Sequence, residues 1–282
     1  APLLLRRFEV DALYEVLEVA IAALDGAGVP YCLVAGSLLG AVRSNSILFC
    51  DDDVDIAVVG AEHLAAARAA LREARVRAVA HFAERPWPAC DRLRPLRATA
   101  TWIDVFCLRQ FDTEADVRAF VYLKANGQPQ DAAIVEACCA TVEDYPIFHY
   151  DAPKAISLWP REFFTRRELL PLRADLRFGP LTGLCGPRHV VGHLCRAFGA
   201  DVFDCYVIRD AHGRAADVAV DTKLALLDGH FPPVQHSKRV RRVASDWTRA
   251  RLHAELKSLA DDEALSLGAR PKLDRLDGSS LC

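Results

Sequence analysis

The sequence lacks methionine and has only two asparagines, Asn45 and Asn126, among 282 residues. Neither asparagine begins an Asn-x-Ser/Thr acceptor, so N-linked glycosylation offers no sign of a secretory route. The chain opens at Ala1. Because a translation product begins with methionine, we expect a processed N-terminus, with any signal or membrane anchor lying before Ala1.

Long apolar runs and an excess of one charge are also absent. No stretch of about 18 apolar residues occurs, which excludes a membrane-spanning helix within these residues. The 35 Lys and Arg residues nearly balance 38 Asp and Glu residues, and the net charge of −3 gives no indication of nucleic-acid binding. Hydrophobic residues at 52% exclude a wholly disordered chain. At about 100–200 residues per domain, the length allows one large domain or two small ones.

The ten cysteines are too few and too scattered to form a small disulfide scaffold. Cys32 and Cys107 lie in apolar runs, where cysteine behaves as a small buried hydrophobe. Cysteine usage therefore leaves the redox compartment open.

Apolar periodicity predicts a mixture of helices and strands. We expect strands over residues 31–35, 53–59 and 99–108, and helices over residues 8–25, 38–42, 61–74, 161–170 and 187–198. The last helix has Pro187 at its start and Gly199 at its end, the usual asymmetry of helix termini. A turn is expected at Asn126-Gly127. Residues 237–259 carry seven Lys or Arg against two Asp or Glu, which predicts a basic helix that is either a solvated face or a contact for an anionic substrate or membrane.

The most informative stretch is residues 36–56, which contains four closely spaced acids, Asp51, Asp52, Asp53 and Asp55. In a strand, side chains alternate, so Asp51, Asp53 and Asp55 are expected on one face and Asp52 on the other. Carboxylates so close repel one another unless a cation neutralises them, and dense oxygen ligands suit Mg²⁺ or Mn²⁺. The stretch therefore predicts a metal site, whereas the alternative is a solvated acidic loop.

Asp104 is a further candidate ligand, because it lies alone in the apolar segment Trp102–Phe106. An unpaired buried carboxylate is costly, so it should meet a cation, ligate a metal or become neutral. If its strand neighbours that of Asp53 and Asp55, the three carboxylates form a site for two divalent ions that clamp a phosphoryl group.

A phosphate-binding turn is expected just upstream, at Gly36-Ser37. Glycine lets the backbone approach a phosphate closely, and the following helix start offers unpaired N–H donors. The alternative is a simple turn and cap. Guanidinium forks match phosphate oxygens, and the candidate arginines are Arg43, Arg92, Arg94 and Arg97. Of these we take Arg43 and Arg92 as the phosphate-binding candidates.

Two other metal sites are weaker alternatives. A calcium loop would use the acids at positions 1, 3, 5 and 12, Asp51, Asp53, Asp55 and Glu62, but Ile56 occupies the sixth position, where the loop needs glycine. A zinc site would combine Cys185, His189, His193 and Cys195. Cys195 lies about 200° around the helix from His193, so capping and packing roles are preferred.

The string GSLLGAVRSNSILFCDDDVDIAV, residues 36–58, resembles the LicD family of phosphorylcholine transferases and fukutin-related transferases. WIDVF, residues 102–106, resembles the strand that carries the family's third carboxylate, and residues 169–203 resemble its later region. The resemblance spans roughly residues 8–206. The sequence departs from the family pattern at Phe49-Cys50 and at Val202-Phe203, which leaves donor and acceptor identity open.

The resemblance implies a polymerase-β-like nucleotidyltransferase fold of the α+β class, with a mixed central sheet flanked by helices. It implies a catalytic domain over residues 1–206, and we expect a mainly helical extension over 207–282 packed on it. By position, Asp53 and Asp55 match the metal-binding pair, Asp51 the preceding acid, Asp104 the third acid, and Gly36-Ser37 the phosphate turn.

The implied reaction is Mg²⁺- or Mn²⁺-dependent transfer of a phospho-alcohol, phosphocholine or a sugar-alcohol phosphate, from a CDP-activated donor to a glycan hydroxyl, with release of CMP. Asp53, Asp55 and Asp104 are the catalytic candidates. A nucleotidyltransferase that moves the nucleoside monophosphate, or a non-catalytic glycan- or partner-binding protein, is the alternative. The implied location is the Golgi lumen or membrane for a eukaryotic source, close to the membrane through an anchor before Ala1, and the cytoplasm for a bacterial one.

Overall fold

The computed structural model describes residues 5–48, 51–82, 89–98, 101–124, 133, 135–136, 138–140, 142, 144–199, 202–203, 205–208 and 222–225. The chain divides into two compact units, residues 1–246 and 247–282. All described residues belong to the first unit. The expected turn at Asn126-Gly127 and the expected basic helix over 237–259 lie outside the described residues.

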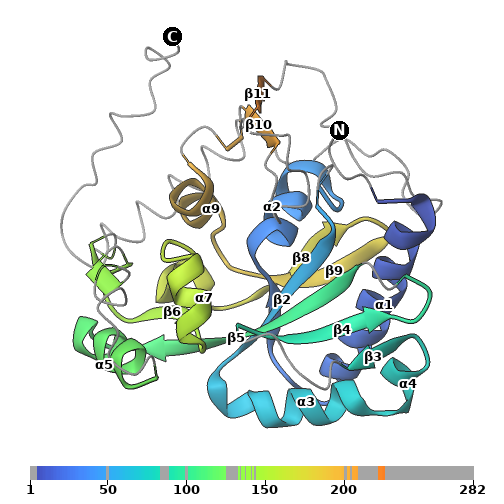
Figure 1. Cartoon of the computed structure of the whole chain (residues 1–282), viewed down its shortest axis with the longest axis horizontal. Helices are drawn as coiled ribbons and strands as arrows, with labels where there is room; N and C mark the ends of the chain where they lie inside the picture. The colour runs from blue at the N-terminus through green and yellow to red at the C-terminus, as the bar shows by residue number, and fades with distance from the viewer. Residues whose placement is uncertain are drawn as a thin grey trace. The chain divides into compact units, whose positions relative to one another are not determined.

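A mixed sheet of seven strands organises the first unit (Figure 1). Its strands are β1 (Tyr31–Leu33), β2 (Asp53–Val59), β3 (Ala80–Phe82), β4 (Asp91–Pro95), β5 (Trp102–Phe111), β6 (Ile147–Tyr150) and β7 (Phe164–Thr165). β2 and β5 run parallel, and the other neighbouring pairs are antiparallel. One side of β5 pairs with β2, and its other side pairs first with β4 and then with β6. The predicted α+β class with a mixed sheet is confirmed.

Helices flank this sheet: α1 (Arg7–Gly26), α2 (Ala35–Ser44), η1 (Ala61–His63), α3 (Leu64–Arg72), α4 (Ala74–Arg77), α5 (Glu114–Lys124), α7 (Pro153–Leu158), α8 (Arg166–Leu169) and α9 (Val191–Phe198). α1 packs against α3, α4 and the strands β4 and β5. Most apolar residues of α1 recur at helical spacing and are buried, although Phe8 in its first turn is exposed. The buried side of α1 explains its position. No described helix is long and apolar enough to cross a membrane.

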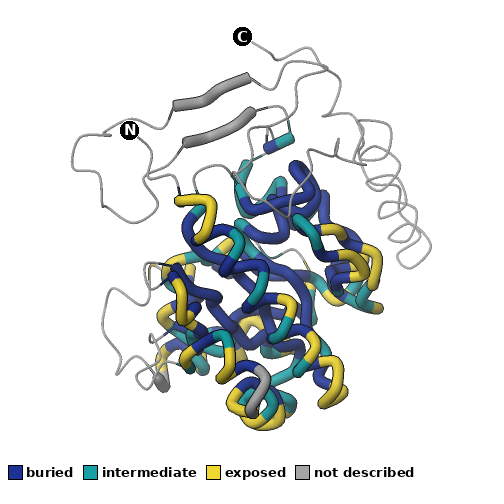
Figure 2. The backbone as a smooth tube through the Cα atoms, turned by 90° about the vertical axis from the view of Figure 1, so that its right-hand side faces the viewer, coloured by how far each residue is buried: buried dark blue, intermediate teal, exposed yellow. Residues whose placement is uncertain are grey.

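The core follows the central strands. Every residue of β1 and β2 is buried, and Figure 2 shows buried positions running through the middle of the described part, with exposed ones along its outer helices and turns. β2 is therefore covered on both faces, and its acidic residues are buried with its apolar ones.

A separate hairpin, β8 (Arg173–Phe178) and β9 (Leu181–Gly186), lies beside β1 and α2. A further antiparallel pair, β10 (Cys205–Ile208) and β11 (Thr222–Ala225), falls mostly within the segment expected to be mainly helical. Those eight residues are strand. Most of residues 207–282 lie outside the described residues, so the domain division at residue 206 stays a prediction.

The predicted elements of the first 108 residues are confirmed with shifted ends, but two later helices differ. The prediction over 161–170 is wrong in its first half, because Phe164 pairs with Phe148 as β7 and the Thr165–Glu168 capping box starts α8 only at residue 166. The prediction over 187–198 begins too early. The backbone N–H groups of Arg188 and His189 donate to carbonyls of residues 169 and 168, so α9 starts at residue 191.

Candidate functional site

The connection from β1 to β2 positions the start of α2 against the acidic strand. Ser37 lies in the first turn of α2 and is buried. Its hydroxyl accepts a hydrogen bond from the backbone N–H of Asp55, at 2.8 Å. The N–H of Val34 donates to the carbonyl of Asp55 at 3.3 Å. These two bonds fix the helix start to the middle of the acidic segment of β2.

Gly36, beside Ser37, allows one carboxylate to come very close. A Cβ at Gly36 would lie 2.6 Å from Oδ2 of Asp51, a separation that no side chain tolerates without displacement. The partial positive charge at a helix N-terminus favours an anion there. In this structure the group beside the expected phosphate turn is the Asp51 side chain, so phosphate binding by Gly36 and Ser37 stays a prediction.

The register of β2 and β5 brings three acids together. Asp55 is directly opposite Asp104 in the parallel pair, and Asp53 lies two residues earlier on the same face of β2. One oxygen from each of these carboxylates lies within 4.8 Å of the others, and all three residues are buried. The predicted meeting of Asp104 with the acids of β2 is confirmed. We call the sheet face that bears them the acid face.

A second group of acids adjoins the first. Asp51, Asp52 and Asp53 also bring one oxygen each within 4.8 Å of one another, so Asp53 belongs to both groups. We had expected Asp52 to point away from the other acids. β2 begins only at Asp53, so strand alternation does not govern the two residues before it. The acid cluster thus comprises Asp51, Asp52, Asp53, Asp55 and Asp104.

Burial and mutual repulsion raise the pKa values of acids in this cluster. Burial, followed by the charges of Asp53, Asp51, Asp104 and Glu162, holds the pKa of Asp55 well above its usual range. Burial and the neighbouring Asp53 likewise raise the pKa of Asp51. Carboxylates in such surroundings gain most from a divalent cation, and hard oxygen donors are the ligands that Mg²⁺ and Mn²⁺ prefer. The acid cluster therefore fits such an ion.

Arg92 is the predicted phosphate ligand that the structure brings to the cluster. It sits opposite Asp104 on β4, and its Nε and Nη2 donate to the two oxygens of Asp104 at 2.7 and 3.1 Å. Its guanidinium also lies over the Trp102 ring, 4.7 Å from the ring centre. A planar cation is therefore already held at the edge of the acids.

The other candidate arginines lie elsewhere. Arg43 is buried near the C-terminal end of α2 and donates from Nη1 to the carbonyl of Val202 at 3.1 Å. Arg94 is exposed, and Arg97 lies 3.8 Å from a carboxylate oxygen of Glu15. A phosphate role for Arg43 stays a prediction. Phe49 and Cys50, where the sequence departs from the family pattern, lie outside the described residues.

Sequence reasoning missed three residues beside the cluster. The Cys90 thiol lies close enough to Asp104 that burial and the charge of that carboxylate raise its pKa. Glu162 is buried, and the hydroxyl of Tyr150 donates to its Oε2 at 2.7 Å. Glu162 stands in the segment Trp159–Phe164, so the signal that revealed Asp104, an acid among aromatic residues, was present here too.

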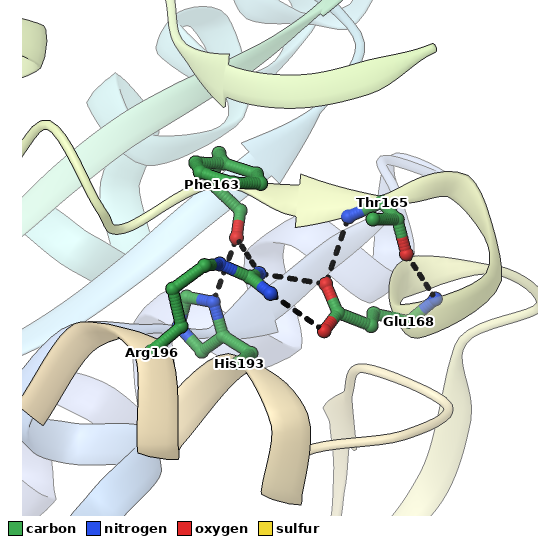
Figure 3. A network of polar contacts seen from close by, with 5 residues as sticks. All are labelled: Phe163, Thr165, Glu168, His193 and Arg196. Carbon is green, nitrogen blue, oxygen red and sulfur yellow. Dashed lines mark hydrogen bonds and ion pairs between the residues drawn. The ribbon is translucent and has the colours of Figure 1, made fainter. Parts of the chain in front are cut away.

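The alternative metal sites do not form. Glu62 is exposed beyond the end of β2, and residues 53–59 of the supposed calcium loop are a strand. The proposed zinc ligands form no ligand group within the described residues. His193 instead stacks on Phe164, with ring centres 3.8 Å apart. Its Nδ1 donates to the carbonyl of Phe163 at 2.9 Å, as Figure 3 shows. The preference for a packing role is confirmed for His193.

Comparison with known families agrees with this geometry. Residues 28–107 match the family model described as LicD/FKTN/FKRP, nucleotidyltransferase domain. This segment belongs to the LicD family. It holds the whole acid cluster, Gly36, Ser37 and Arg92, but ends before Tyr150 and Glu162, and it is narrower than the span of 8–206 that we expected. No curated protein matches the chain.

Proposed function

We propose that this LicD-family protein is a metal-dependent transferase that moves a phospho-alcohol from a CDP-activated donor to a glycan hydroxyl and releases CMP. The observation that carries the proposal is the mutual approach of Asp53, Asp55 and Asp104 within the LicD segment. Buried acids with strongly raised pKa values are typical of functional sites.

Asp53, Asp55 and Asp104 are the proposed ligands of Mg²⁺ or Mn²⁺, with Asp51 as a further ligand. When bound, the ion neutralises phosphoryl oxygens and stabilises the charge that develops during transfer. The LicD-family segment supplies the ligands from two paired strands, so their separation is set by the sheet and not by a loop.

Among the residues of the chain, Arg92 is the one proposed to bind the donor phosphate. In the structure without ligands its fork is occupied by Asp104, and carboxylate and phosphate offer it the same pair of oxygens. Arg92 would therefore orient the donor phosphate, while Asp104 would hold the cation. Ser37 keeps the backbone of Asp55 in place through its hydrogen bond, and catalysis arises mainly from positioning and electrostatics.

Two measurements test the function. The first is the melting temperature with CDP-choline, CDP-ribitol, CDP-glycerol or CTP, each with and without Mg²⁺, since a specific ligand stabilises the folded state by mass action. The second is product analysis. We expect CMP release from a CDP-alcohol; transfer of the nucleotide itself to an acceptor would identify a nucleotidyltransferase, and no melting shift with any compound would indicate a non-catalytic protein.

A further inference from the structure

Glu162 is a buried carboxylate outside the LicD segment. It lies between α7 and β7 and is 7% exposed, and its bonding partner Tyr150, at the end of β6, is 1% exposed. Among the described residues no arginine, lysine or histidine pairs with Glu162, and the Tyr150 hydroxyl is its side-chain hydrogen-bond donor. A buried carboxylate without a cation is costly to keep. A carboxylate buried at this cost therefore points to a function.

The register of the sheet places Tyr150 on the acid face. Tyr150 is opposite Leu108 on β5, and Leu108 lies on the same face as Phe106 and Asp104. The rings of Phe106 and Tyr150 pack 4.6 Å apart, and Trp159 lies edge-on to both. Phe106 and Tyr150 thus extend the acid face with an aromatic cluster, to which Trp159 adds its ring.

Charge links the two regions. The charge of Glu162 raises the pKa of Asp55, and the charge of Asp55 raises the pKa of Tyr150 after the larger contributions of burial and Glu162. Because Asp55, Tyr150 and Glu162 are all buried, water screens this field only weakly. Glu162 therefore adds negative potential at Asp55 without touching it in the described contacts.

We propose that Glu162, held by Tyr150, is a positioning residue of the metal site that draws a divalent cation to Asp53, Asp55 and Asp104 through its field and does not ligate the ion. This inference rests on the metal site of the proposed function. It extends that site beyond the LicD segment, to a carboxylate supplied by the later part of the chain.

The field of Glu162 exists only while its carboxylate is ionised. Burial raises the pKa of Glu162 to about 7, and the hydrogen bond from Tyr150 acts in the opposite direction. The titratable group that acts on Glu162 from a packed element is Tyr150 of β6, on which Asp55 of β2 and Cys32 of β1 act in turn. The contribution of Glu162 to cation affinity is therefore absent below about pH 6 and complete above about pH 8.

The test measures Mn²⁺ binding to the full chain between about pH 5.5 and pH 8.5. The expected ratio of wild-type to Glu162→Gln affinity is one at the acidic end and about three- to tenfold at the alkaline end. Tyr150→Phe keeps the aromatic ring but removes the hydrogen bond that lowers the pKa of Glu162, so the step should move to higher pH. Glu9→Gln and Tyr14→Phe are matched controls, since both residues are buried and Tyr14 accepts from Ile47 N–H. Neither should change the step.

A ratio that is the same at every pH, including a uniform loss, would overturn the inference, because a structural role has no reason to follow the ionisation of Glu162. Failure of the wild type to bind Mn²⁺ would overturn both the inference and the metal site. A pH step in the ratio without CMP release would support the inference and reject only the transfer reaction. Asp53→Asn should abolish Mn²⁺ binding and so identifies the site that is measured.

Discussion

Buried charges are paired at the contact between α8 and α9, whereas in the acid cluster carboxylates crowd together. At α8 and α9, Arg196 donates to both oxygens of Glu168, at 3.0 and 2.7 Å, and to the carbonyl of Phe163 (Figure 3). Thr165 N–H also donates to Glu168. In the acid cluster, Asp104 has Arg92, but Asp51 and Asp55 carry pKa values raised by burial and by one another.

This difference separates structural charge from functional charge. A matched buried ion pair fixes how two elements pack, and removing one partner leaves the other charge stranded. Crowded acids with raised pKa values destabilise the fold that holds them, which is expected where a site is arranged for a ligand that neutralises it. The following experiments test whether the two regions respond in opposite directions.

Replacing Asp53 or Asp55 by alanine should give the largest effect. We expect CMP release from the CDP-alcohol substrate to fall at least about 10³-fold, because each variant removes a proposed metal ligand. The metal-free melting temperature should stay equal or rise, since the variant relieves repulsion. Asp175→Ala, at an exposed acid of β8, is the control. Undiminished CMP release by both variants would contradict the assignment.

Glu168→Ala should lower the stability of the fold and not the transfer activity. It strands the Arg196 guanidinium, which is one-fifth exposed, and removes the capping bond of α8. We expect a loss of about 2–4 kcal/mol in the free energy of unfolding, measured with urea at neutral pH. A loss below about 1 kcal/mol would mean that the pair contributes little, and the comparison between the two regions would fail.

Stability should fall on both sides of an intermediate pH when no metal is present. Burial lowers the pKa of His193 to about 4 and that of His149 to about 3. As the pH falls, these histidines are therefore protonated in the unfolded state before they are protonated in the folded state. The stability that the neutral histidines contribute above about pH 6.5 is lost in that range. Thermal unfolding across pH measures this loss, and His193→Gln should flatten it.

The buried acids should change stability with pH in the direction opposite to that of the histidines. Their folded pKa values are raised, so stability is greatest below about pH 4 and is lost as the pH rises, through about 7 for Glu162. Mg²⁺ should remove this alkaline loss and leave the acidic one unchanged. Equal sensitivity of both sides to Mg²⁺ would contradict the separation of the two regions.

Gly36→Ala should give the smallest change in stability but a measurable change in function. The new Cβ would displace the Asp51 carboxylate, since the atoms that it would meet belong to that side chain and not to the backbone. We expect Mg²⁺ affinity to drop about tenfold, with less than about 1 kcal/mol lost in stability. Gly26→Ala, where a Cβ meets nothing within 4 Å, is the matched control. Wild-type affinity in Gly36→Ala would show that the position of Asp51 does not matter.

The central part of the site was predictable because strand physics is local. DVDIAVV has the β-branched composition of a buried strand, and side-chain alternation then pairs Asp53 with Asp55. Asp104 was recognisable as an acid in an apolar run. Their contact follows from placing β2 next to β5, which the resemblance to the LicD family favoured.

The missed features depend on contacts that periodicity does not encode. Glu162 reaches the acid face only because β6 pairs with the far half of β5, some 40 residues later in the chain. Phe164 joins β7 through pairing with Phe148, against the helical pattern around it. The position of Arg92 required the register of β4, which composition alone does not fix.

The division of the outer edge of β5 between β4 and β6 has a consequence for the link from β5 to β6. Each half of the strand is anchored by its own neighbour, so the long link from β5 to β6 can gain or lose residues while Asp104 keeps its place opposite Asp55. Changes in that link can thus alter the half of β5 that pairs with β6 and leave the pairing of Asp104 with Asp55 unchanged.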